Sequence, residues 1–166
     1  MIIDIAVHAA RGRPVRDAGP SPFLRSSVDP RWPVVAAALH HLCLTRRRSL
    51  RIVDVACGNG RLLIHAARHA RALGFTGIEA RGIDIAPSLI ASAQVGALRV
   101  RDPAIGLVFE TCDLLTALEE EAGFPADILL WSGDGDTSRP MAAAIAAAAN
   151  IVVSGSARCG GRQVAA

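Results

Sequence analysis

The sequence predicts an α/β fold in which a mainly parallel sheet lies between layers of helices. Residues 51–63 read RIVDVACGNGRLL, where a run of β-type apolar residues ends in a turn with two glycines and a helical pattern begins at once. Strand-like and helix-like stretches then alternate as far as residue 132. Such alternation is typical of strands joined by helical crossovers. A glycine turn after a central parallel strand is where open α/β sheets bind cofactors.

Length and composition indicate one globular domain. The chain has 166 residues, of which 51% are hydrophobic and 20% charged, and no apolar run is long enough to cross a membrane. No signal peptide is evident at the N-terminus. Four widely spaced cysteines support neither a zinc site nor a disulfide framework. We therefore expect a cytoplasmic protein without a metal or a membrane partner.

The positive charge is concentrated in the first third of the chain. All 18 basic residues are arginine, and residues 1–51 hold nine of them against three acidic residues. A basic segment can approach an anionic substrate or a nucleic acid. Base composition of the source genome is the simpler explanation, because almost no aromatic residues accompany the arginines for base stacking. We expect a small-molecule substrate rather than a nucleic acid.

The residues around the glycine turn restrict the choice of cofactor. A dinucleotide-binding turn has a small residue five positions after its first glycine, but here that position is Leu63. Asp54 lies inside the strand, four residues before Gly58. A carboxylate buried at a strand end needs hydrogen-bond donors or a cation to offset its desolvation. The turn's own amides or a cationic ligand could supply them.

The segment Val53–Gly60 resembles the first motif of class I S-adenosylmethionine (SAM) methyltransferases. The resemblance implies a Rossmann-like three-layer αβα sandwich and SAM as cofactor. It also implies that the loop holds the methionine part of SAM, with Asp54 near the amino group. The loop residues are Ala56, Cys57, Gly58, Asn59 and Gly60.

Two further strand ends complete the predicted cofactor site. A strand over residues 75–86 carries Asp84 near its end, where an acid can accept hydrogen bonds from ribose hydroxyls. Residues 82–88, which include Ile85, resemble the second methyltransferase motif. A third strand over 106–111 leads to Cys112, Asp113 and Leu114. The resemblance places Asp113 near the adenine amine, with its neighbours flanking the ring. Alternatively, Asp113 caps the following helix, and both roles could coexist.

The fourth strand, over residues 126–132, leads into the region expected to face the methyl donor. Its continuous apolar run predicts burial on both faces. Ser132 ends it and is assigned to the cofactor site. Asp134 and Asp136 follow; each could act as a base or hold the acceptor, or simply form a flexible turn. No other catalytic residue is evident. Residues 119–121, three glutamates, are expected to form a solvated helix face.

The remaining segments predict the outer parts of the fold. Residues 1–32 form a loop-rich segment before a domain over 33–166. A helix from Pro33 is expected to end in the arginines 46–48, with Val34, Val35, Ala38, Leu39, Leu42 and Cys43 on its apolar face and surface histidines at 40 and 41. Helices are also expected at about 61–73 and 87–100, and a last one from Pro140 to about residue 152.

The C-terminal part of the chain departs from the family pattern. Residues 158–165 resemble the family's turn into a fifth strand. The family's sheet ends in an antiparallel hairpin, which we expect to be missing here. A bare fifth strand would be an exposed sheet edge, so we expect a second copy of the chain or another partner to cover it.

Together the motifs predict a SAM-dependent methyltransferase with an unidentified acceptor. The alternative is a SAM-binding or interaction module, truncated or without catalytic activity. A nucleotide-dependent oxidoreductase is a third hypothesis, against which Leu63 argues.

Overall fold

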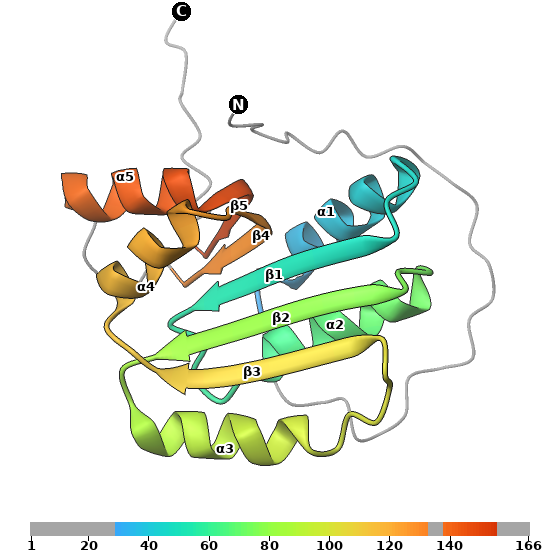
Figure 1. Ribbon diagram of the computed structural model, residues 1–166, viewed down its shortest axis with the longest axis horizontal. Helices are drawn as coiled ribbons and strands as arrows, with labels where there is room; N and C mark the ends of the chain where they lie inside the picture. The colour runs from blue at the N-terminus through green and yellow to red at the C-terminus, as the bar shows by residue number, and fades with distance from the viewer. Residues whose placement is uncertain (1–28, 133–137, 156–166) are drawn as a thin grey trace, which may run out of the picture.

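The computed structural model describes residues 29–132 and 138–155, which form one five-stranded sheet with helices on both faces. The strand order is β3-β2-β1-β4-β5, and every neighbouring pair is parallel. All the arrowheads therefore lie at the same end of the sheet (Figure 1). The chain builds β2 and β3 on one side of β1 and then returns to β4 on the other. The carboxyl ends of β1 and β4 thus form the topological switch point, where such sheets bind ligands.

The elements follow one another in the predicted order. The strands are β1 (Ser49–Val55), β2 (Gly77–Asp84), β3 (Ile105–Thr111), β4 (Ala126–Trp131) and β5 (Ala149–Ser154). The helices are α1 (Trp32–Leu44), α2 (Arg61–Ala72), α3 (Pro87–Ala97), α4 (Leu114–Ala122) and α5 (Arg139–Ala148). None of the helices in the described ranges is long and apolar enough to cross a membrane.

Alternate residues of the central strands fill two separate cores. Ile52 of β1 and Leu130 of β4 pack with α1, α2 and α3 on one face of the sheet. Val53 of β1 and Leu129 of β4 pack with α4 and α5 on the other face. This division follows from the two-residue period of a strand and confirms the predicted three layers. All six residues of β4 are buried, as its apolar run predicts.

Helix α1 differs from its prediction at its C-terminal end and on its apolar face. It ends at Leu44, and Arg46 beyond it has a φ of 60°, so the arginines 46–48 lie outside the helix. Val34, expected in the core, is 45% exposed, whereas Val35 and Leu39 are fully buried. The histidines at 40 and 41 are exposed, as expected.

The end of the last helix was predicted wrongly. Helix α5 stops at Ala148, and the strand β5 begins at the next residue and pairs with β4. The alanine run favours a helix, but Ile151, Val152 and Val153 are β-branched and fit a pleated surface better. Val153 is buried in the core below α1 and α2. The fifth strand therefore lies nearer in sequence than residues 158–165, which are outside the described residues.

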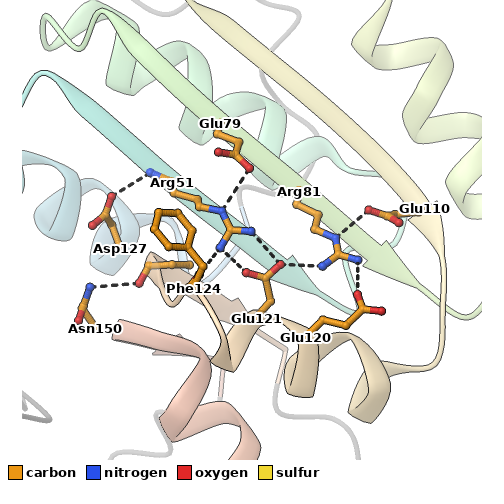
Figure 2. Close-up of polar contacts among 10 residues, drawn as sticks. Arg51, Glu79, Arg81, Glu110, Glu120, Glu121, Phe124, Asp127 and Asn150 are labelled. Atoms are coloured by element: carbon orange, nitrogen blue, oxygen red, sulfur yellow. Dashed lines mark hydrogen bonds and ion pairs between the residues drawn. The ribbon is translucent and has the colours of Figure 1, made fainter.

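The glutamate run on α4 is not a uniformly solvated face. Glu121 is only 2% exposed and binds the guanidinium groups of Arg51 on β1 and Arg81 on β2 (Figure 2). The Nη2 atom of Arg51 donates to Glu121 over 3.1 Å, and Nη1 of Arg81 donates to it over 2.7 Å. Because Glu121 faces the sheet, this pair of contacts holds α4 against β1 and β2.

The start of β4 is fixed by a second buried acid. Asp127 accepts a hydrogen bond of 2.9 Å from the backbone N–H of Arg51 and pairs with Arg47. Asp127 is 7% exposed, so these donors replace the water that its carboxylate loses. The contact joins the beginnings of β1 and β4, at the end of the sheet opposite the candidate site.

Replacing Glu121 with Gln should destabilise the fold by about 3 kcal/mol, because two arginines lose their shared buried carboxylate. Glu120→Gln is the matched control, since Glu120 also pairs with Arg81 but its side chain is 57% exposed. Its cost should stay below about 1 kcal/mol. Urea denaturation of both variants measures the difference. Equal losses would show that the Glu121 contacts do not hold α4 in place.

Candidate functional site

The loop after β1 has an unusual backbone conformation. Ala56, Gly58 and Gly60 all have positive φ values, of 59°, 57° and 71°. The backbone N–H of Cys57 donates to Ile83 at the end of β2, and the N–H of Gly60 donates to Cys57 within the loop. An alanine at φ 59° is strained, so the neighbouring contacts must hold it there. The loop is thus preformed between β1 and α2.

The two glycines of the loop have different roles. A Cβ on Gly60 would lie 2.5 Å from the Phe109 ring and 2.9 Å from Ala93, so this glycine permits close packing between the loop, α3 and β3. A Cβ on Gly58 would meet nothing within 4 Å. Gly58 therefore borders open space at the carboxyl end of the sheet. A ligand in that space would meet bare backbone there.

Asp84 connects the three loops that sequence motifs assigned to the site. Its Oδ2 accepts a hydrogen bond of 2.8 Å from the N–H of Gly58, and its Oδ1 accepts one of 2.9 Å from the N–H of Ala86. Its backbone carbonyl accepts a hydrogen bond from Cys112 in the loop after β3. Each carboxylate oxygen keeps a second lone pair that can accept a hydrogen bond from a hydroxyl group. The carboxylate thus positions the loop and still has acceptor capacity.

Asp54 is a fully buried carboxyl group with few compensating contacts. Neither of its oxygens accepts a hydrogen bond from the described protein, and both are inaccessible to solvent. Its strand neighbours are Gly82 and Leu130. The closest charge is the Arg31 guanidinium, whose Nη1 lies 3.6 Å from Oδ1. Burial raises the pKa of Asp54 to about 7, although Arg31 opposes the shift.

Arg31 was not predicted as a site residue. It comes directly before α1, and its guanidinium is held by Asp29 through two hydrogen bonds of 3.0 and 2.9 Å. That contact lowers the pKa of Asp29. Arg31 is 23 positions before Asp54 in a proline-rich stretch, and no motif or periodicity in the sequence connects the two.

The loops after β2 and β3 present both apolar and polar groups. Ile85 directly follows Asp84, and its side chain is 65% exposed. Cys112 and Leu114 are half-buried. The carboxylate of Asp113 accepts hydrogen bonds from the N–H and the hydroxyl of Thr116, which confirms the helix-capping alternative. These bonds lower the pKa of Asp113. Contact between Asp113 and a purine remains a prediction.

The thiol beside the glycines is not suited to nucleophilic chemistry. Cys57 is 7% exposed, and burial raises the pKa of its thiol to about 12. It is therefore protonated at neutral pH, whereas a nucleophilic cysteine is a thiolate. No group of three or more His, Cys, Asp or Glu side chains in the described segments could hold a metal ion. Cys57 serves instead to fill space beneath the loop.

The end of β4 lies next to the end of β1, because Trp131 is the register partner of Val55. Ser132 therefore follows β4 close to Ala56. It lies at the carboxyl end of the sheet, as the other predicted cofactor residues do. A Cβ on Gly155 would collide with the Ser132 carbonyl, so the ends of β4 and β5 are also in close contact. The candidate catalytic residues Asp134 and Asp136 are outside the described residues.

The fold is similar to that of solved methyltransferase structures. Magnesium protoporphyrin IX methyltransferase from Synechocystis with bound SAM matches over 82% of this chain and 64% of its own, with 20% identity and a TM-score of 0.52. The same enzyme with bound S-adenosylhomocysteine (SAH) matches over 74% and 55%, with 20% identity and a TM-score of 0.51. A SAM-dependent methyltransferase from Agrobacterium tumefaciens matches over 62% and 31%, with 20% identity and a TM-score of 0.46.

The described part of the chain has a Rossmann-like α/β fold, which it shares with magnesium protoporphyrin IX methyltransferase. No protein-family model and no curated protein matches the sequence. The chain spans between about a third and just under two thirds of the length of the three matched structures. At this level of identity the shared feature is the fold itself.

The parallel sheet brings most of the predicted residues to its carboxyl end, here called the rim. Three loops with the predicted cofactor residues are joined by the contacts of Asp84, and Ser132 lies beside the first of them. Asp54 lies beneath this rim, on the face of the sheet covered by α1 and α2. The Arg31 guanidinium already supplies one positive charge nearby, so what the two Asp54 oxygens lack is a hydrogen-bond donor, which a cationic group with N–H donors would provide.

The stability of the free protein should fall as pH rises from about 4 to about 7. An unfolded Asp ionises near pH 4, whereas Asp54 in the fold stays protonated until about pH 7. Folding thus becomes less favourable over that window, by up to about 4 kcal/mol from this one group, and the loss is complete above it.

Asp54→Asn removes the ionisation and keeps the size of the side chain. Urea denaturation at several pH values should show a smaller decline between pH 4 and 7 for this variant than for the wild type. Parallel pH profiles for the two proteins would contradict the raised pKa of Asp54.

Proposed function

We propose that the chain is a methyltransferase that uses SAM as the methyl donor. The observation that supports this most strongly is the buried carboxyl group of Asp54, which lacks a hydrogen-bond partner beneath an open glycine loop. SAM carries an ammonium group that would supply the missing hydrogen-bond donors and a second positive charge beside that of Arg31. Its positive sulfonium would also gain from a nearby carboxylate.

The contacts proposed for the cofactor follow from the geometry of the rim. The methionine part would lie over Ala56, Cys57, Gly58, Asn59 and Gly60, with its ammonium group directed to Asp54. The carboxylate oxygens of Asp84 would accept hydrogen bonds from the ribose hydroxyl groups. The exposed Ile85 side chain and Leu114 offer apolar surface to the adenine ring. Cys112, Asp113 and Ser132 would complete the edge of the site.

The chain's own contribution to catalysis would be positioning and exclusion of water. When bound, SAM would supply an electrophilic methyl group for an acceptor nucleophile, with SAH as the leaving group. The acceptor's proton, where it has one, passes to solvent or to a base. Asp134 and Asp136 remain candidates for that base from their place after β4. A small molecule remains the proposed acceptor class.

The test uses two glycine substitutions, both at positions with a positive φ. Gly58→Ala forces a side chain into the left-handed region, at about 1–2 kcal/mol, and places a methyl group in the open space at the rim. Gly74→Ala also has a positive φ and an unobstructed Cβ, but it lies at the far end of α2. Calorimetric titration should show at least a tenfold loss of SAM and SAH affinity for Gly58→Ala alone.

Further controls separate binding from turnover. NAD should not bind, because Leu63 occupies the position of the small residue in dinucleotide sites. Wild-type protein that binds neither SAM nor SAH, or that loses affinity equally in both glycine variants, would contradict the proposed site. Release of SAH from SAM in the presence of small-molecule extracts distinguishes an enzyme from a SAM-binding module without catalytic activity.

A further inference from the structure

A shallow, open cavity lies at the opposite end of the sheet from the glycine loop. A cavity of about 460 Å³, open to solvent, is formed by the end of α2 and the segment that leads from α3 into β3. In Figure 1 this is the end where the strand arrows begin. Its charged lining residues are Arg68, Arg71, Arg99, Arg101 and Asp102. Nothing in the cofactor proposal uses this cavity.

One of the four arginines is neutralised within the cavity wall. The Nε atom of Arg71 lies 2.9 Å from Oδ2 of Asp102, and its Nη1 donates to the Phe75 carbonyl. The other oxygen of Asp102 accepts from the backbone N–H of Ala104. Asp102 and Arg71 are thus a fixed pair. They give the cavity a rigid side without net charge.

The other three arginines have no carboxylate partner among the described residues. Arg68 donates only to a backbone carbonyl, that of Arg99, over 3.5 Å. Arg99 and Arg101 form no ion pair with residues 29–132 or 138–155, and both side chains are exposed. The cavity therefore gathers three uncompensated positive charges. Their mutual repulsion is a cost that an anion would remove.

The dipoles of the neighbouring helices offset only part of the positive charge of the three arginines. Helices α2 and α3 both end beside the cavity, and a helix C-terminus carries about half a negative charge. Two such ends offset about one arginine. A net charge of about +2 remains, which the neighbouring structure does not balance. A ligand with at least two negative charges would complete the balance.

We propose that this arginine cavity binds a small molecule bearing two or more phosphate charges. Guanidinium groups bind phosphate oxygens through paired hydrogen bonds, which favours phosphate over a simple halide. No aromatic side chain lines the cavity, so stacked bases have no platform and a single-stranded nucleic acid is a poor fit. The site is separate from the rim that would hold the cofactor. It is therefore independent of the methyltransferase proposal.

Pyrophosphate and orthophosphate are the probes, used with the full chain in calorimetric titrations at 50 and 200 mM NaCl. The proposal expects pyrophosphate to bind at least tenfold more tightly than orthophosphate, with one site per chain. The double variant Arg99→Gln/Arg101→Gln should lose at least tenfold in pyrophosphate affinity. Neither side chain has a partner in the part of the chain that the structure describes, so the fold should be unaffected.

The matched control is Arg46→Gln/Arg48→Gln. It removes the same charge from two exposed arginines outside the cavity and should leave pyrophosphate affinity within twofold of the wild type. Equal losses in the two double variants would mean general charge attraction and would overturn the proposal. Binding only at millimolar pyrophosphate, or tighter binding of single-stranded oligonucleotide through Arg99 and Arg101, would overturn it as well.

Discussion

The contacts of Asp84 are the constraint on which the rim of the sheet depends. Its carboxylate holds the N–H groups of Gly58 and Ala86, and its carbonyl holds that of Cys112. Three loops that are distant in sequence are therefore fixed by one residue at the end of β2. The positive φ of Ala56 and Gly58 is tolerated because these contacts hold the loop in place. A loop fixed before a ligand arrives loses little entropy when the ligand binds.

Asp54 shows the opposite use of a carboxyl group. Asp84 has its donors within the fold, whereas Asp54 is buried between Gly82 and Leu130 with Arg31 at 3.6 Å and no hydrogen bond. Such burial costs stability in the free protein. A fold keeps this arrangement most readily where a bound partner recovers the cost. This is the physical reason for proposing a cationic ligand above β1 rather than a neutral one.

The sequence predicted the parts of the structure that depend on neighbouring residues. The glycine turn, the order of strands and helices, and the capping role of Asp113 all follow from patterns a few residues long. The contacts it did not predict are distant in sequence. Glu121 pairs with Arg51 and Arg81, 70 and 40 residues away, so a run of three glutamates could not reveal which one faces the sheet. Arg31 approaches Asp54 only through the entry of α1. Near β5 two local patterns conflicted, because the alanine run favours a helix and residues 151–153 favour a strand. Pairing with β4 stabilises the strand that begins after Ala148.

The most direct test of the account is the exchange of protons when SAM binds. Burial raises the pKa of Asp54 to about 7, so part of the carboxyl is protonated near neutral pH in the free protein, and a docked ammonium group would ionise it. Calorimetric titration in buffers of different ionisation enthalpy should therefore show net proton release from the wild type near pH 6 to 7, and Asp54→Asn should lack this release. Tight SAM binding without proton release between pH 6 and 8 would show that Asp54 does not face the ligand's positive charge. That result would contradict the central claim.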